Sequence, residues 1–245
     1  MTHAVNGRSR GARLRSGLPV LAAAFAALAL FGAPAAGAPA TGDVYVYRLI
    51  NGFNSETVGR IRYEVERVGG GRVELAVTPD QSAAGWERTE VQTPDGNGLR
   101  QLIDSHGVKV EYEFAAPYPA YVFPLDSGKS WSVRVGARVP AADRIRNVRV
   151  DGRVLGRERI RVPAGEFDAI KVRRFVYAGD DEFPYSETSI METDWYAPAL
   201  GRSVRLERRS EFVDHSLCTE DMSCLDHLGD WDIVELVEAR AARRP

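Results

Sequence analysis

The chain of 245 residues consists largely of short alternating segments separated by turn residues, and this pattern limits its fold more than any other feature. In Val108–Phe114, apolar or aromatic side chains alternate with charged ones, which is the period of a strand with one buried and one wet face. Asn51-Gly52, Gly69–Gly71 and Asp151-Gly152 are turn sequences, and each is expected to join two strands. No stretch beyond the N-terminal segment keeps a helical period, although Ala142–Asn147 is compatible with one helical turn. We therefore predict about a dozen strands in an all-β, antiparallel domain with little helix, arranged as a single strongly curved sheet, an open β-barrel or a sandwich.

Residues 1–40 have the composition of a signal peptide. Four arginines precede an Ala/Leu-rich stretch at Leu18–Phe31, and Ala-x-Ala cleavage sequences follow at residues 33–35 and 38–40. The apolar stretch is shorter than the ~20 residues that a spanning helix needs. We expect cleavage and a periplasmic or secreted protein without a stable membrane span, and an uncleaved N-terminal anchor is the alternative.

The rest of the chain is mildly acidic. Removal of residues 1–40 takes away four of the 32 Lys and Arg residues and none of the 34 Asp and Glu residues, so the formal charge falls from −2 to −6. Such a charge argues against nucleic acid or anionic lipid as a bulk electrostatic partner. Residues 41–238 suit one domain, with a loop at 214–229, a closing strand at Trp231–Val237 and a frayed basic tail at 239–245.

Three motifs carry a resemblance to a known group of proteins. They are Phe-Pro-Leu-x-x-Gly-Lys-x-Trp at residues 123–131, Val-Pro-Ala-Gly-x-Phe-x-x-x-Lys-Val at 162–172 and Trp-Tyr-Ala-Pro-x-x-Gly at 195–201. In this order they resemble segments of exported bacterial β-proteins of unknown function, the TapB-like proteins and related uncharacterised periplasmic proteins. The resemblance covers residues 42–212 and implies an exported all-β fold. It implies no mechanism, because the family has no catalytic motif to transfer.

Cys218 and Cys224 are the only cysteines, and an oxidising compartment favours a disulfide between them. The alternative is a zinc site, because His215 and His227 stand three residues outside the two cysteines and zinc accepts two His and two Cys ligands tetrahedrally. Exported thiols tend to oxidise, and no other feature of the sequence demands a metal. The disulfide is therefore preferred over the zinc site and over free thiols, and no cofactor is expected.

The sequence offers little for catalysis. It has no Gly-x-Ser-x-Gly motif, and the adjacent residues Asp104-Ser105-His106 do not converge as a triad does. Asp180, Asp181 and Glu182 form the densest acidic run, but acids in a loop between strands are usually solvated, and a glycosidase needs two carboxyl groups facing each other. We expect no enzyme. A carboxylate-based hydrolase acting on an envelope polymer is kept as an alternative.

Aromatic residues at strand starts and in loops are the best candidates for binding. The set comprises Trp86, Tyr118, Tyr121, Trp131, Trp195 and Tyr196. They are predicted to line a cavity in the curved sheet that takes an apolar or amphiphilic ligand, such as a lipid or a lipoprotein acyl chain. The alternatives are that they fill the core and turns, or that the protein is a structural module that pairs with another envelope protein.

Overall fold

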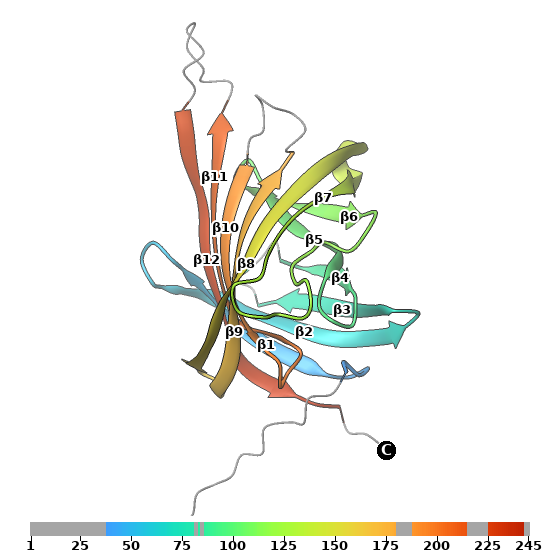
Figure 1. Ribbon diagram of the computed structural model, residues 1–245, viewed down its shortest axis with the longest axis vertical. Helices are drawn as coiled ribbons and strands as arrows, with labels where there is room; N and C mark the ends of the chain where they lie inside the picture. The colour runs from blue at the N-terminus through green and yellow to red at the C-terminus, as the bar shows by residue number, and fades with distance from the viewer. Residues whose placement is uncertain (1–37, 81–82, 84–85, 180–187, 215–224, 243–245) are drawn as a thin grey trace, which may run out of the picture. The chain divides into compact units, whose positions relative to one another are not determined.

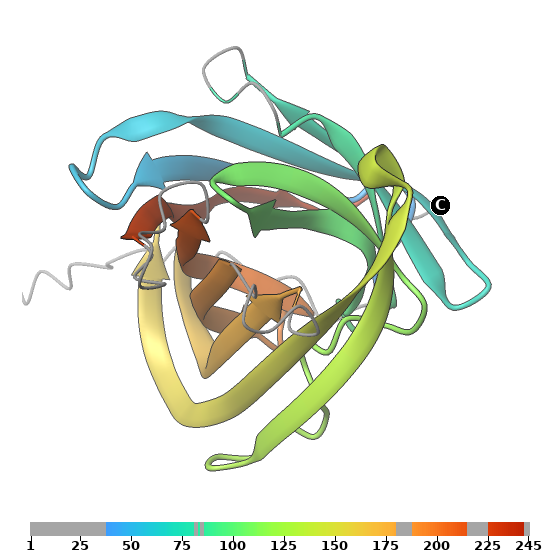
Figure 2. The same ribbon diagram turned by 90° about the horizontal axis from the view of Figure 1, so that it is seen from above.

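The computed structural model describes residues 38–80, 83, 86–179, 188–214 and 225–242, and twelve antiparallel strands within these ranges close into a barrel. Each strand pairs with its neighbours in the sequence, and β1 pairs with β12 to complete the ring (Figures 1 and 2). The all-β antiparallel prediction is confirmed, and the sheet is a closed barrel and not the open one that we considered. The strands are β1 Val44–Asn51, β2 Thr57–Gly69, β3 Arg72–Pro79, β4 Arg88–Gln92, β5 Gly98–Ser105, β6 Val108–Phe114, β7 Ser130–Val139, β8 Arg144–Val162, β9 Gly165–Ala178, β10 Thr188–Ala197, β11 Arg202–Asp214 and β12 Leu225–Arg240.

Alternation along the strands fills the interior with two apolar clusters. In β3, Val73, Leu75 and Val77 are fully buried, and the residues between them are not. One cluster gathers side chains of β5–β10, and the other gathers side chains of β1–β3 and β8–β12. Each buried aliphatic side chain contributes about 1.5–3 kcal/mol relative to an exposed one, so these clusters supply most of the stabilisation of the barrel.

The turn predicted at Asp151-Gly152 is wrong, because β8 runs without interruption through these residues. Gly152 lies opposite Trp131 in the β7–β8 pairing, and a Cβ atom at this position would overlap the Trp131 ring. Glycine is required here by the packing of an indole ring, and no turn is formed.

Helical structure in the described residues is limited to short 3₁₀ turns. One of them is Pro140–Ala142, which ends at Asp143 in the left-handed region with φ 47°. The strand β8 begins at Arg144, so the helical turn considered for 142–147 is replaced by a strand. No helix in this part of the chain is long and apolar enough to cross a bilayer.

The last strand is longer at both ends than the sequence suggested. Residues 225–228, expected in a loop, pair with β11, and His227 lies opposite Phe212. Ala239 and Arg240, expected in a frayed tail, pair with β1, and the Ala242 backbone N–H donates to Asp43 Oδ1 at 2.8 Å. The chain therefore belongs to the barrel as far as residue 242.

Candidate ligand-binding site

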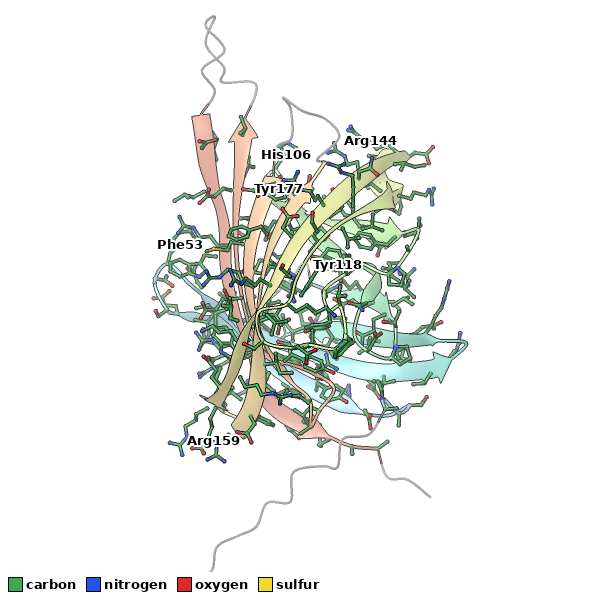
Figure 3. The ribbon with its side chains drawn as sticks, in the orientation of Figure 1. Phe53, His106, Tyr118, Arg144, Arg159 and Tyr177 are labelled. Atoms are coloured by element: carbon green, nitrogen blue, oxygen red, sulfur yellow. The ribbon has the colours of Figure 1, made fainter. Side chains whose placement is uncertain are left out.

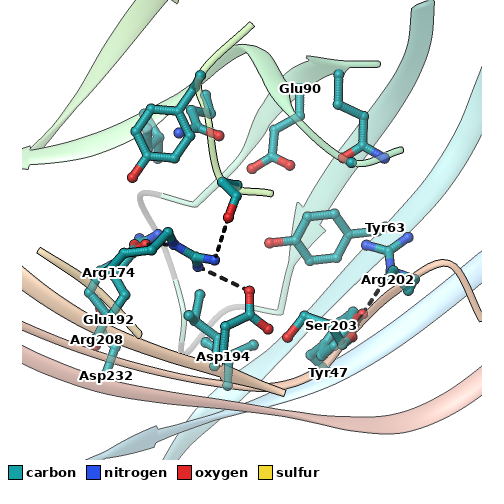
Figure 4. Close-up of a pocket in the computed structure, with 18 of the residues that line it drawn as sticks. Tyr47, Tyr63, Glu90, Arg174, Glu192, Asp194, Arg202, Ser203, Arg208 and Asp232 are labelled. Atoms are coloured by element: carbon teal, nitrogen blue, oxygen red, sulfur yellow. Dashed lines mark hydrogen bonds and ion pairs between the residues drawn. The ribbon is translucent and has the colours of Figure 1, made fainter. Parts of the chain in front are cut away.

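A cavity of about 160 Å³ lies within the barrel (Figure 4). Its wall takes side chains from both apolar clusters and from the connection between β6 and β7. We call this cavity the lumen pocket. Aromatic rings and ionisable groups dominate its lining: Tyr47, Tyr63, Trp86, Tyr118 and Tyr121, with Arg88, Glu90, Arg174, Glu192, Asp194, Arg202, Arg208 and Asp232.

Residues 115–129, which we call the strap, bring two of these tyrosines to the pocket. Tyr118 and Tyr121 are buried, and Figure 3 shows Tyr118 among the side chains between the strands. The Tyr118 backbone N–H donates to the Gly98 carbonyl at 2.7 Å. Asn97 makes two hydrogen bonds with the backbone of Tyr121, of 2.8 and 3.0 Å. β5 and the residue before it therefore hold the strap in place.

Glu192 is the centre of a buried ion network. It lies on β10, directly opposite Arg174 of β9 and Arg208 of β11. Arg174 Nε is 2.8 Å from Glu192 Oε2, and Arg208 Nε is 2.8 Å from Glu192 Oε1. Arg174 also reaches Asp194 Oδ2 at 3.0 Å and donates to the Ala120 carbonyl of the strap at 3.1 Å. One arginine thus joins two strands and the strap.

The network fixes the charge of its members. Burial alone would raise the pKa of Glu192, but Arg174 and Arg208 outweigh it and lower the pKa to about 2. Burial, and then the Asp194 carboxylate, raise the pKa of Tyr121 well above its ordinary value, and the Tyr121 hydroxyl donates to Asp194 Oδ2 at 2.6 Å. At neutral pH, Glu192 is a carboxylate and Tyr121 is a neutral phenol.

A second group of charges surrounds Lys109. Its Nζ is 3.0 Å from Asp104 Oδ1 and 2.9 Å from carboxylate oxygens of both Asp230 and Asp232. The same Nζ lies 4.9 Å from the centre of the Trp86 ring. Asp232 and Asp104 also act on Arg208, so this group and the Glu192 network form one electrostatic unit.

Arg202 stands apart from both groups. Its guanidinium carbon lies 3.8 Å from the centre of the Tyr45 ring and 5.5 and 5.6 Å from those of Tyr47 and Tyr63. Its Nε donates to the Tyr47 hydroxyl at 2.8 Å. Burial raises the pKa of Tyr47 to about 12, although Arg202 acts against this rise. Within the described ranges, Arg202 forms no ion pair with a carboxylate.

Comparison with known proteins gives distant likenesses of fold. No family model matches the chain, and no curated protein matches it. Among solved structures, a protein of Parabacteroides distasonis provisionally described as a lipoprotein shares 14% identity and a TM-score of 0.44, with 82% of this chain and 96% of that chain covered. A protein of Bacteroides fragilis provisionally described as exported, with a YmcC-like fold, shares 12% identity and a TM-score of 0.46, with 82% and 97% covered. The hypothetical lipoprotein YmcC of Escherichia coli shares 10% identity and a TM-score of 0.44, with 83% and 87% covered. Likeness at this level carries no argument about what this chain does, and the TapB-like resemblance stays an expectation.

The structure divides the predicted aromatic set. Trp86, Tyr118 and Tyr121 line the lumen pocket. Tyr196 packs behind it, with its ring centre 4.8 Å from that of Tyr121. Trp131 and Trp195 lie elsewhere: Trp131 Nε1 donates to the Pro119 carbonyl at 3.1 Å, and Trp195 Nε1 donates to Glu158. A role in ligand binding stays a prediction for the three that line the pocket.

Several predicted features lie outside the described residues. These are the signal peptide as far as residue 37, the acidic run Asp180–Glu182, and His215, Cys218 and Cys224 of the disulfide or zinc alternatives. His227 is described and stacks on Phe212 with ring centres 5.3 Å apart. Within the described part of the chain, no group of three or more His, Cys, Asp and Glu side chains is arranged to hold a metal ion.

The buried charges were missed from the sequence. Arg174 stands between Val172 and Val176 on the buried face of β9, and Glu192 and Asp194 follow Ile190 on the buried face of β10. A charged residue that continues an apolar face at strand period is the signal that was available.

Proposed function

We infer that this protein is a non-catalytic, exported binding protein that takes a small amphiphilic molecule into the lumen pocket of its barrel. One observation carries this proposal, namely a pocket whose wall combines aromatic rings with buried ionisable groups. Ligand sites are typically concave and aromatic, with a few placed polar groups that orient the ligand. Export rests on the signal-like residues 1–40.

The size and polarity of the pocket favour a ligand of about one ring over an acyl chain. A cavity of about 150 Å³ accommodates benzene, and the lumen pocket measures about 160 Å³. A methylene chain laid along Arg174, Glu192 and Asp194 would exclude water from the pocket and offer no hydrogen bond of its own to these groups, which is unfavourable. We therefore replace the expected lipid chain with a small molecule that carries polar groups.

The protonation state of Glu192 supports a role without catalysis. A carboxylate-based hydrolase needs one carboxyl group that is protonated near neutral pH. Glu192, with its pKa lowered to about 2, stays ionised. Asp194 is held by Arg174 and Tyr121. Glu192 is therefore unsuited to the role of the protonated acid.

Native mass spectrometry of the full chain, purified from an exporting host, tests the proposal. We expect a small-molecule adduct that is released on denaturation. Ala120→Phe, which introduces a ring into the pocket, should abolish the adduct, whereas Ala199→Phe on an exposed turn should keep it. A folded protein without an adduct that also binds no member of a ring-sized fragment library would refute the proposal.

An interaction module is the second candidate, because the outer wall carries a row of apolar side chains. Phe175 and Met191, which are 44% and 41% exposed, lie opposite each other on β9 and β10. Arg209 of β11 interrupts the row and lies opposite both Met191 and Trp231. The Trp231 ring packs against that of Phe53, with ring centres 5.6 Å apart, and Figure 3 labels Phe53. A photo-crosslinking residue at position 175 should capture a defined envelope protein if this face binds one, and should give no specific product otherwise.

A further inference from the structure

The two ends of one ligand can be assigned to two residues of the lumen pocket. We propose that the ligand is a small zwitterion whose ammonium group binds at Asp194 and whose carboxylate binds at Arg202. This inference rests on the proposed function and names the ligand class of the same pocket. It depends on a carboxylate oxygen of Asp194 that has no hydrogen-bond partner and on a guanidinium of Arg202 that has no carboxylate partner, both among the described residues. The two residues line the pocket from the neighbouring strands β10 and β11 (Figure 4).

Asp194 has an acceptor without a donor. Its Oδ2 atom takes hydrogen bonds from Tyr121 at 2.6 Å and Arg174 at 3.0 Å. Its Oδ1 atom is buried and has no hydrogen-bond partner among the described residues. The side chain as a whole is 3% exposed. Because a buried carboxylate oxygen without a donor is unfavourable, a ligand N–H that reaches Oδ1 is stabilised there.

The charge of the surrounding network favours a cationic donor over a neutral one. Arg174, Arg208 and Lys109 are its cations. Its buried or largely buried carboxylates outnumber these cations by one and are Asp104, Glu192, Asp194 and Asp232. Asp230 at the rim adds a further negative charge. A region with excess negative charge and little water attracts an ammonium group. The surplus acids surround Lys109, which belongs to the same electrostatic unit, so a cationic group at Asp194 fits the charge of that unit.

Arg202 is a partly buried cation that lacks an anionic partner among the described residues. It forms no ion pair with a carboxylate of the described chain, and its Nε is already used by the Tyr47 hydroxyl. Three tyrosine rings hold the guanidinium in one orientation. Guanidinium groups bind carboxylates by paired hydrogen bonds, and these bonds are stronger where water is scarce. An anionic end of the ligand completes this site.

The wall near both residues is aromatic. Tyr63 and Tyr121 line the same pocket, as does Trp86. A lining rich in aromatic side chains suits a planar or single-ring body that joins the two charged ends. A zwitterion of this kind also leaves the net charge of the lumen unchanged, so binding adds no uncompensated buried charge.

Isothermal titration calorimetry with two matched probe series tests the inference. The first series is para-(aminomethyl)benzoate with the single-charge analogues para-toluate and para-methylbenzylamine. The second is L-phenylalanine with hydrocinnamate and phenethylamine, in which the two charges are closer together. In at least one series the zwitterion should bind about tenfold or more tightly than either analogue.

Two variants should separate the two ends of the ligand. Asp194→Asn should weaken the zwitterion and the amine about tenfold and leave the acid unchanged, and Arg202→Gln should weaken the zwitterion and the acid and leave the amine unchanged. Asp168→Asn and Arg173→Gln, at exposed positions of β9, should change none of the affinities. Thermal unfolding checks that each variant is folded, and the comparison of probes on the unaltered protein needs no variant.

The outcomes separate this inference from the proposed function. If the analogues bind as tightly as the zwitterions, or if each variant weakens all probes alike, the zwitterion assignment is wrong. If no zwitterion binds but native mass spectrometry detects a bound small molecule, the assignment fails and the binding function stands. If neither is seen with folded protein, both fail.

Discussion

Glu192 Oε2 lies 2.8 Å from Arg174 Nε inside the barrel, and the two residues are directly opposed in the β9–β10 pairing. Both side chains are almost fully buried. Arg174 also holds Asp194, so loss of its charge would leave two carboxylates without their shared partner. The ion pair is therefore a condition for the folded lumen.

Replacement of Arg174 should destabilise the protein strongly. Arg174→Met keeps much of the side-chain volume but leaves Glu192 with Arg208 alone and Asp194 with Tyr121 alone, and we expect a loss of about 3–5 kcal/mol in the free energy of unfolding. Urea denaturation followed by circular dichroism measures it. The matched control is Arg173→Met, an exposed neighbour on the same strand, with an expected change within about 0.5 kcal/mol. Equal losses for the two variants would contradict the role of the pair.

Acid should weaken the barrel through Glu192. Its folded-state pKa of about 2 lies below the ordinary value of 4.5, so its contribution is fully present above pH 4.5 and is lost as the pH falls toward 2. The shift corresponds to about 3 kcal/mol. Urea midpoints measured between neutral pH and pH 2 should fall less steeply in Glu192→Gln than in the unaltered chain. Glu211→Gln, at an exposed position of β11, should reproduce the unaltered slope. Parallel curves for Glu192→Gln and the unaltered chain would show that another group is responsible.

A methyl group at Gly152 should disturb the packing of Trp131. We expect Gly152→Ala to lower the free energy of unfolding by about 1–3 kcal/mol, because the indole ring must move. Gly136→Ala on β7 is the control, since its Cβ would meet Asn147 Oδ1 at an ordinary 3.7 Å. In a Trp131→Leu background the Gly152 substitution should be milder, and a double-mutant cycle without such coupling would argue against this explanation.

The hydroxyl of Tyr121 should contribute more to the free energy of unfolding than the hydroxyl of the neighbouring Tyr196. Tyr121→Phe removes a donor to the buried Asp194 carboxylate, and we expect a loss of about 1–3 kcal/mol. Tyr196→Phe alters a ring in contact with Tyr121, and its hydroxyl has no hydrogen-bond partner within the described ranges, so the change should stay within about 0.5 kcal/mol. Chemical denaturation of both variants decides the matter, and a Tyr196 variant as unstable as the Tyr121 variant would assign the effect to the ring alone.

Local patterns in the sequence predict much of the strand content. The bounds of β6 match the alternating segment Val108–Phe114, and the Gly69–Gly71 turn joins β2 to β3 as expected. These features depend on neighbours in the sequence, and period and turn chemistry report such neighbours. The turn predicted at Asp151-Gly152 was wrong because Gly152 makes room for the Trp131 ring. Trp131 lies some twenty residues away along the chain but opposite Gly152 in the sheet.

The charged part of the lumen pocket could not be predicted from local patterns, although Trp86, Tyr118 and Tyr121 were among the expected aromatic residues. Alternation indicates that Glu192 shares a face with Asp194, but it does not show that this face is buried or that Arg174 and Arg208 lie on either side. Those pairings depend on register, which bulges shift in several pairs of strands, including β10–β11. The Pro and Tyr residues of the strap indicate a connection between strands, but its hydrogen bonds to Asn97 and Arg174 follow only from the closed barrel.

The pairing of β1 with β12 also has a consequence for the order in which the protein can be completed. The two strands lie at opposite ends of the domain's sequence. Whichever strand is delivered first therefore keeps an unpaired edge until almost the whole chain is present. Long-range pairing of this kind is slow, and free edges are open to pairing with other chains. A chain exported in an extended form would therefore need protection throughout its passage, and an interruption before the last strand would leave an aggregation-prone product with two open edges.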